Sequence, residues 1–188
     1  MTIRDTTTGY GWPTRIVHWA MAVAIVGMYV LGLWMVDLDY YSPYYHSAPD
    51  LHRSIGMVLL LVLVVRLLWR LANDKPSDDD LSVFERTAAR IVHWGFYPLL
   101  FALMASGYLM STADGRPVEV FDWFSIPALT HDKSLEKPAG AIHEILAHVT
   151  ILLVIVHALA AFKHQFYDRN GVLSRMWSGS SSNGSKAS

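Results

Sequence analysis

The chain has 188 residues, of which 53% are hydrophobic and only 16% are charged, and its formal net charge is -1. This composition is too apolar for an ordinary soluble domain and too mixed for a wholly membrane-embedded chain, so we expect several membrane helices joined by polar loops. The balanced charge gives no reason to expect a nucleic-acid partner, and the absence of cysteine excludes disulfides and every metal site that depends on thiolate ligands.

Residues 1–13 contain no short apolar stretch that ends in a small-residue cleavage site, so we expect no removable signal peptide. Downstream, four segments reach the roughly 20 apolar residues that a bilayer-spanning helix needs. They lie at about 14–36, 52–71, 91–112 and 142–162. The second is the weakest because Arg66 and Arg70 fall in its last turns, but long basic side chains near a helix end can reach the interface.

Polar loops separate the predicted spans. A Tyr-rich loop lies at 40–45, an acidic loop at 74–80 and a long third loop at 113–141. Within the third loop, residues 118–124 suit a plain turn or a short interfacial helix. The sequence after Trp177 is rich in Ser and Gly, and we expect residues 168–188 to form a disordered cytoplasmic tail.

The 15 Lys and Arg residues are divided unevenly between the two sides of the predicted membrane domain, 14–167. The side with both termini and the acidic loop holds Arg4, Arg15, Arg66, Arg70, Lys75, Arg86, Arg90, Lys163, Arg169, Arg175 and Lys186. The other side holds only Arg53, Arg116, Lys133 and Lys137. Because the cytoplasmic side usually carries the excess, we expect both termini in the cytoplasm. The predicted fold is an all-α membrane protein, a four-transmembrane-helix antiparallel bundle with sites between facing helices.

Two histidines of the fourth span, His143 and His157, are the most informative residues of the chain. They lie fourteen residues apart, which separates them by roughly 21 Å along a helix and leaves them within about 40° of the same face. Ionisable side chains at membrane depth are costly and tend to be functional, so each needs a partner or a ligand. One helix could therefore hold two stacked sites.

The predicted topology gives each of these histidines a partner at equal depth. His18 and His157 lie toward the cytoplasmic side and form the inner pair, whereas His52 and His143 form the outer pair. A structural zinc ion is usually bound by four protein ligands and a catalytic one by three, so two imidazoles are too few for either. Two imidazoles match the two axial positions of haem iron. Basic residues near the helix ends are candidate partners of the haem propionates. They are Arg15, Arg66, Arg90 and Lys163 at the inner side and Arg53, Lys133 and Lys137 at the outer side, with Arg15 and Arg53 as the first candidates.

A short internal repeat offers a rival inner ligand. Residues 90–94, Arg-Ile-Val-His-Trp, repeat residues 15–19 letter for letter, which hints at a duplication of a two-helix unit. Fourteen residues also separate His52 from Arg66, where the fourth span has its histidine pair. His93 is therefore a rival to His18 as the partner of His157, and the role of His148 stays open.

The order and spacing of these motifs resemble the bacterial cytochrome b561 family of di-haem membrane cytochromes. The likeness covers roughly residues 11–166 and rests on four stretches: 15–19, Leu51 to Gly56, the His93/Tyr97/Gly107 run, and His143-Glu144 through His157 to Ala161. It implies two non-covalently bound b-type haems, with axial ligands on His18, His52, His143 and His157 and with His93 not usually a ligand. It also implies ubiquinone as a substrate and a multi-pass place in the bacterial inner membrane.

The resemblance implies two lines of function within electron transport. Some relatives resemble a superoxide oxidase, an oxidoreductase that passes electrons from periplasmic superoxide to ubiquinone of the respiratory chain. Others carry electrons for a dehydrogenase or hydrogenase partner, and these often have longer chains. The short chain favours the first line, but the outer loops hold more acids than bases, which would not attract an anion. An intramembrane metal or proton conduit is the alternative outside electron transfer, although Glu144 is the only carboxylate near the histidines.

Overall fold

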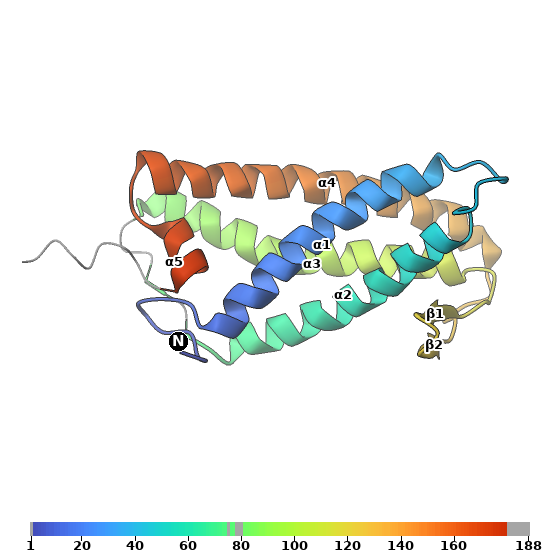
Figure 1. Ribbon diagram of the computed structural model, residues 1–188, viewed down its shortest axis with the longest axis horizontal. Coiled ribbons are helices and arrows are strands. Elements are labelled where there is room, and N and C mark those ends of the chain that lie inside the picture. Colours follow the sequence, from blue (N-terminus) through green and yellow to red (C-terminus); the bar gives the residue numbers. More distant parts are fainter. Residues whose placement is uncertain (1, 75, 78–80, 180–188) are drawn as a thin grey trace, which may run out of the picture. The chain divides into compact units, whose positions relative to one another are not determined.

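The computed structural model describes residues 2–74, 76–77 and 81–179. Four long helices dominate it (Figure 1), and all four are long and apolar enough to cross a membrane. Their bounds are α1 Trp12–Val36, α2 Ser47–Leu71, α3 Val83–Thr112 and α4 Glu136–Phe162. Each begins before the predicted span and ends at the same residue. The prediction of a four-transmembrane-helix protein is confirmed, whereas Lys75, Lys186 and most of the acidic loop lie outside the described residues.

Local hydrogen bonds explain why two helices begin earlier than hydropathy indicates. At α3, the backbone N–H of Glu85 donates to Ser82 Oγ at 3.3 Å, and the backbone N–H of Ser82 donates to Glu85 Oε2 at 3.2 Å. This reciprocal capping box satisfies two donors at the helix start. At α1, the buried Asp5 accepts from the Gly11 N–H at 2.7 Å and from Thr14 Oγ1 at 2.9 Å. Both starts are therefore fixed by polar residues outside the apolar runs.

The helix surfaces carry many exposed apolar side chains. Val23, Leu61 and Leu159, for example, are 72%, 64% and 62% exposed. Monomeric soluble proteins rarely expose contiguous apolar patches of such extent, whereas lipid tails accept them without cost. The exposed apolar faces therefore agree with helices that lie in a bilayer.

The chain divides into two compact units. The first unit comprises Met1–Met21, Val64–Phe96 and Leu152–Ser188, and the second comprises Ala22–Leu63 and Tyr97–Ile151. The first unit takes the beginnings of α1 and α3 and the ends of α2 and α4, and the second takes the opposite ends. This alternation is what an up-down-up-down helix order produces.

The long third loop contains a β-hairpin, which the sequence analysis did not predict. Strand β1, Val118–Val120, pairs antiparallel with β2, Phe124–Ile126. Phe121 and Asp122 turn the chain in the left-handed region, with φ of 48° and 57°. The hairpin is attached to α2 by Ser54, whose hydroxyl donates to the Glu119 carbonyl at 3.2 Å and accepts from the Phe121 N–H at 3.1 Å. Residues 118–124 therefore form neither a plain turn nor a helix, because Val118 and Val120 alternate inward around Glu119.

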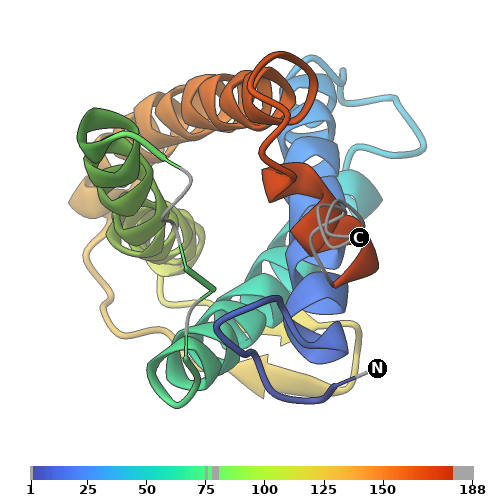
Figure 2. The same cartoon turned by 90° about the vertical axis from the view of Figure 1, so that its left-hand side faces the viewer.

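The expectation of a disordered segment at 168–188 is wrong for its first part. A short π-helical turn, Lys163–Tyr167, follows α4, and helix α5, Val172–Ser178, lies beside the beginning of α1 (Figure 2). Arg175 of α5 is buried and donates to the carbonyl oxygens of Ser77 at 2.6 Å and Asn170 at 3.4 Å. These bonds order a segment that composition alone describes as polar. Residues 180–188 lie outside the described residues.

Candidate functional site

The second unit brings the outer pair together. His52 comes from α2 and His143 from α4, and their ring centres lie 6.2 Å apart with an angle of 77° between the ring planes. Both side chains are half-buried. The structure therefore places two imidazoles from facing helices at one site, as their predicted depths require.

The hydrogen bond of His143 fixes which ring nitrogen is free. Its Nδ1 lies 2.8 Å from the carbonyl oxygen of Leu103 on α3, and since a carbonyl can only accept, Nδ1 carries the hydrogen. The neutral ring then keeps a lone pair on Nε2, which is the form that binds metal. His52 Nδ1 is buried and has no hydrogen-bond partner among the residues that the structure describes.

Two glycines give the imidazole rings of the outer pair their space. A Cβ atom built on Gly107 of α3 would lie 2.8 Å from both Cε1 and Nδ1 of His143, closer than real Cβ atoms come to their neighbours. A Cβ atom built on Gly32 of α1 would lie 3.4 Å from Cε1 of His52. The helix backbone therefore approaches both rings, and most closely at Gly107.

A cavity of about 400 Å³ contains the outer pair. Its volume lies in the usual range of cofactor and ligand sites. Its walls are largely apolar and include Met28, Met57, Leu100 and Met104, together with the hydroxyl-bearing Thr150. Thr150 Oγ1 is buried and has no partner among the described residues. An apolar cavity lined by two imidazole rings suits a large, flat, mostly apolar metal complex.

Cationic side chains also line this cavity, and two of them are paired with acids. Arg53, predicted as a propionate partner, forms an ion pair with Asp50, and Arg116 donates from Nε to Asp114 at 2.6 Å. The Arg116 guanidinium lowers the pKa of Asp114 through this hydrogen bond. Lys133 is a further basic residue of the lining. The lining therefore offers positive charge to a carboxylate, although acids in contact with the two arginines partly neutralise it.

The first unit brings the inner pair together in a more crowded setting. The ring centres of His18 and His157 lie 6.3 Å apart, and those of His93 and His157 lie 5.2 Å apart. Arg66 Nη2 lies 3.1 Å from His18 Nδ1. His18 and its predicted rival His93 thus both neighbour His157, and Arg66 of α2 contacts His18.

The ring separations test whether a metal fits between the imidazoles. Two metal–nitrogen bonds of about 2 Å, with each ring centre about 1.1 Å behind its nitrogen, put the ring centres about 6.2 Å apart. The separations of the outer and inner pairs, 6.2 Å and 6.3 Å, match this value. The 5.2 Å between His93 and His157 is shorter, which favours His18 as the partner of His157. Both pairs therefore fit a bis-imidazole haem iron.

Arg15, a predicted propionate partner at the inner side, contacts α5. Its Nη2 donates to the carbonyl oxygen of Trp177, and Trp19 Nε1 donates to the carbonyl oxygen of Met176 at 3.2 Å. Carbonyl groups at a helix C-terminus lack partners within the helix, so these donors satisfy them. Arg15 and Trp19, which flank His18 in the sequence, therefore both bind α5.

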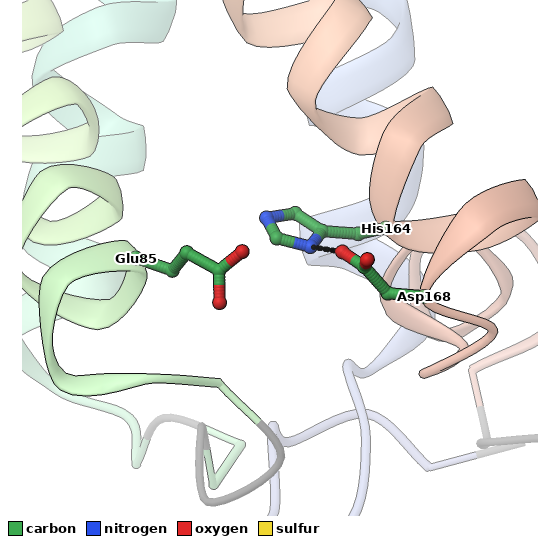
Figure 3. Close-up of side chains that lie close together, drawn as sticks. All are labelled: Glu85, His164 and Asp168. Atoms are coloured by element: carbon green, nitrogen blue, oxygen red, sulfur yellow. Dashed lines mark hydrogen bonds and ion pairs between the residues drawn. The ribbon is translucent and has the colours of Figure 1, made fainter.

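One other cluster has the residue types of a metal site. Among the described residues, Glu85, His164 and Asp168 form the group of three metal-binding side chains, with ligand atoms within 4.8 Å of one another (Figure 3). However, Lys163 Nζ lies 2.6 Å from Glu85 Oε1 and 2.9 Å from Asp168 Oδ2. The cation that neutralises these carboxylates is thus a lysine, and the hydrogen bond from Lys163 lowers the pKa of Asp168. We assign this cluster as an ion-pair network between α3 and the π-helical segment that follows α4.

The sequence analysis missed the contacts of Gly32, Gly107 and Arg66, although one signal pointed to them. Each glycine lies fourteen residues after the histidine of an Arg-Ile-Val-His-Trp run, and Arg66 lies fourteen residues after His52. The spacing of His143 and His157 is thus present in all four helices. Residues at this spacing share a helix face, and the structure shows that the glycines face histidines.

The chain is similar to known proteins over most of its length. A family model described as prokaryotic cytochrome b561 matches residues 9–179. Cytochrome b561 homolog 2 of Escherichia coli (strain K12) is 45% identical over 184 residues, which is 97% of this chain and 98% of that protein. The probable superoxide oxidase CybB of Yersinia pestis is 25% identical over 168 residues, 85% of this chain and 90% of that protein. Cytochrome b561 homolog 1 of Escherichia coli (strain K12) is 23% identical over 128 residues, 68% and 73% of the two chains.

The match to the family model and the relative at 45% identity both extend over nearly the whole chain. They agree with the four apolar helices and the absence of cysteine. The chain therefore belongs to the prokaryotic cytochrome b561 family, multi-pass bacterial membrane proteins that bind b-type haem and transfer electrons.

Proposed function

We propose that the protein carries two b-type haems and transfers electrons between a donor at the periplasmic side and the quinone pool. The observation that carries this proposal is the presence of two histidine pairs, each with its ring centres at the separation that a bis-imidazole iron requires. His52 and His143 would hold one haem, and His18 and His157 the other. Bound haem iron supplies a one-electron carrier that needs no proton of its own.

The chain's residues have distinct roles in this proposal. The Leu103 carbonyl orients His143 through its Nδ1–H, which keeps Nε2 directed away from that bond. Gly107 allows the ring to lie close to α3. The apolar walls of the cavity exclude water, and Arg53, Arg116 and Lys133 offer charge to the cofactor's carboxylates.

The distribution of basic residues supports an orientation in the bacterial inner membrane. With both termini in the cytoplasm, residues 1–13 and 168–188 flank a membrane domain at 14–167. The outer pair then lies toward the periplasm and the inner pair toward the cytoplasm. Electrons from a periplasmic donor would reach the outer pair first.

Superoxide with ubiquinone is the first candidate substrate pair. The likeness to a protein named a probable superoxide oxidase supports it, at 25% identity. The basic residues of the outer cavity would attract a small anion. The pairing of Arg53 with Asp50 and of Arg116 with Asp114 weakens that attraction. A redox protein, such as a dehydrogenase or hydrogenase subunit, is the second candidate donor.

A reduced-minus-oxidised absorption spectrum tests the two-haem proposal. We expect b-type bands and two haems per polypeptide in the purified protein. His157→Ala should lose the inner haem and keep the outer one, and His143→Ala should do the reverse. A spectrum without b-type bands, or one haem per polypeptide in the unmodified protein, would contradict the proposal. Absence of haem would also revive the conduit alternative, which ion or proton flux through proteoliposomes would measure.

The substrate candidates are separated by anaerobic reduction. Ubiquinol and a superoxide-generating system should each reduce the haems if the protein couples superoxide to the quinone pool. Reduction by ubiquinol alone would favour a redox-protein donor. If neither reduces the haems while dithionite does, the quinone link is wrong.

A further inference from the structure

Each of the four long helices has a histidine and a second notable residue fourteen positions later. In α1 and α3, a histidine is followed fourteen residues later by a glycine: His18 with Gly32, and His93 with Gly107. In α2 and α4, a histidine is followed at the same spacing by Arg66 and by His157. The helix pair α1–α2 therefore matches the pair α3–α4 at every one of these positions except 66 and 157.

The second unit shows that the match extends to contacts. Gly32 of α1 lies against the ring of His52 of α2, and Gly107 of α3 lies against the ring of His143 of α4. These are equivalent contacts, one within each helix pair. The outer pair thus consists of two equivalent histidines, one from each half of the repeat.

In the first unit, the contacts of Arg66 and His157, which occupy equivalent positions in the two helix pairs, also correspond to each other. His18 of α1 contacts Arg66 of α2, with 3.1 Å between Nδ1 and Nη2. His93 of α3 contacts His157 of α4, with ring centres 5.2 Å apart. The inner pair, His18 with His157, joins one half of the repeat to the other. In the repeat, His18 corresponds to His93 and His157 corresponds to position 66, so the equivalent of the inner pair would be His93 with the residue at position 66.

We infer that Arg66 occupies the position of a fourth inner histidine and determines which pair of residues binds the inner haem. This inference rests on the proposed two-haem function. It states that Arg66 alone decides which two histidines bind the inner haem. A guanidinium has no lone pair for a metal, so Arg66 removes His93 with residue 66 as a ligand pair. It leaves His18 with His157, which has the separation that a metal requires.

The contact of Arg66 with His18 also determines which ring nitrogen of His18 carries the hydrogen. Because a guanidinium only donates, His18 Nδ1 accepts in this contact, and the hydrogen of the neutral ring lies on Nε2. If His18 were to hold iron through Nε2, that hydrogen would have to lie on Nδ1, where it would face the guanidinium. The present contact of Arg66 with Nδ1 would then be lost, which would free its charge for another partner.

A rescue experiment tests the selection by Arg66. His157→Ala should lose the inner haem, and adding Arg66→His should restore it by providing the pair of residue 66 with His93. Adding His93→Ala to that double variant should abolish the rescue, whereas adding His18→Ala should not. Arg66→Gln in the His157→Ala background is the matched control, since it removes the charge without adding a ligand, and it should not restore haem.

The measurements are haem per polypeptide and the reduction potential of each haem, neither of which depends on turnover. The outer haem reports folding in every variant. If the rescue variant loses both haems, Arg66→His in the His18→Ala background serves as the second test, and it should restore an inner haem that depends on His93. Failure to restore it, or a rescue that depends on His18 instead of His93, overturns the inference. One haem in the unmodified protein would instead overturn the two-haem function itself.

Discussion

The two units place histidine pairs in different surroundings. In the second unit, His52 and His143 each lie against a glycine and share an apolar cavity of about 400 Å³. In the first unit, His18 and His157 lie among Arg66, His93 and residues that hold α5. One spacing along four helices thus gives an open, nearly symmetric site and a crowded, asymmetric one. The difference shows that glycines leave space for the histidine rings of one pair, whereas a charged residue, Arg66, contacts a histidine of the other.

The largest expected effect is at Gly107 of the second unit. Gly107→Ala puts a Cβ atom 2.8 Å from the His143 ring, so we expect loss of most of the outer haem. Alanine favours a helix over glycine by about 1 kcal/mol, so the change should not unfold α3. Gly32→Ala is the matched control, because its Cβ atom has 3.4 Å of clearance and should leave the haem in place. Equal haem content in the two variants would show that these clearances do not control binding.

The next largest effect concerns the helix that distinguishes the first unit. Arg175→Ala removes hydrogen bonds from a buried guanidinium to Ser77 and Asn170. Hydrogen bonds to charged groups contribute about 2 kcal/mol each, so α5 should detach from its neighbours. Hydrogen exchange should rise in Val172–Ser178, while the outer haem stays bound. Unchanged exchange there would mean that other contacts suffice to hold α5.

A smaller effect is expected inside the outer cavity. Thr150→Val replaces a buried hydroxyl that has no partner among the described residues with a methyl group of the same shape. The cost of an unpaired buried hydroxyl predicts a gain of about 1 kcal/mol in the free energy of unfolding. Denaturant titration of the purified protein would measure it, with Thr150→Ser as the control that keeps the hydroxyl. A loss of stability in the valine variant would indicate that the bound cofactor uses this hydroxyl.

The smallest effect is the pH dependence of the ion-pair network in the first unit. Lys163 lowers the pKa of Asp168, so the folded protein favours the carboxylate more than the unfolded chain does. The resulting stabilisation is present above the unfolded pKa and is lost as the pH falls through the lower, folded pKa. Asp168→Asn should therefore reduce the fall in Tm between about pH 7 and about pH 3. An identical fall in the variant would show that this carboxylate does not contribute.

Hydropathy and histidine spacing predicted the parts of the molecule that depend on long-range periodicity. The four helices end where their apolar runs end, and histidines that share a predicted depth lie together in the structure. These features follow from the length of a bilayer helix and from 3.6 residues per turn, both of which a sequence displays directly.

The features that the sequence analysis missed depend on local polar bonds. The early start of α3 was readable as a Ser82-x-x-Glu85 capping box, but an apolar window does not detect it. The order of α5 depends on Arg175 reaching a carbonyl about one hundred residues away in the sequence, which no local pattern encodes. The contact of Arg15 with the carbonyl of Trp177 likewise depends on the order of α5, which hydropathy does not show.

The link from Arg175 to Ser77 also has a consequence for the order of assembly during synthesis. Every residue of the second unit lies between Ala22 and Ile151, so that unit is complete before α5 is made. The N–H of Ser77 donates to Thr7 at 2.9 Å, and the carbonyl of the same residue accepts from Arg175. The first unit therefore closes only after Arg175 has left the ribosome. Chains synthesised from the N-terminus would thus contain the complete outer pair, His52 with His143, before the first unit closes.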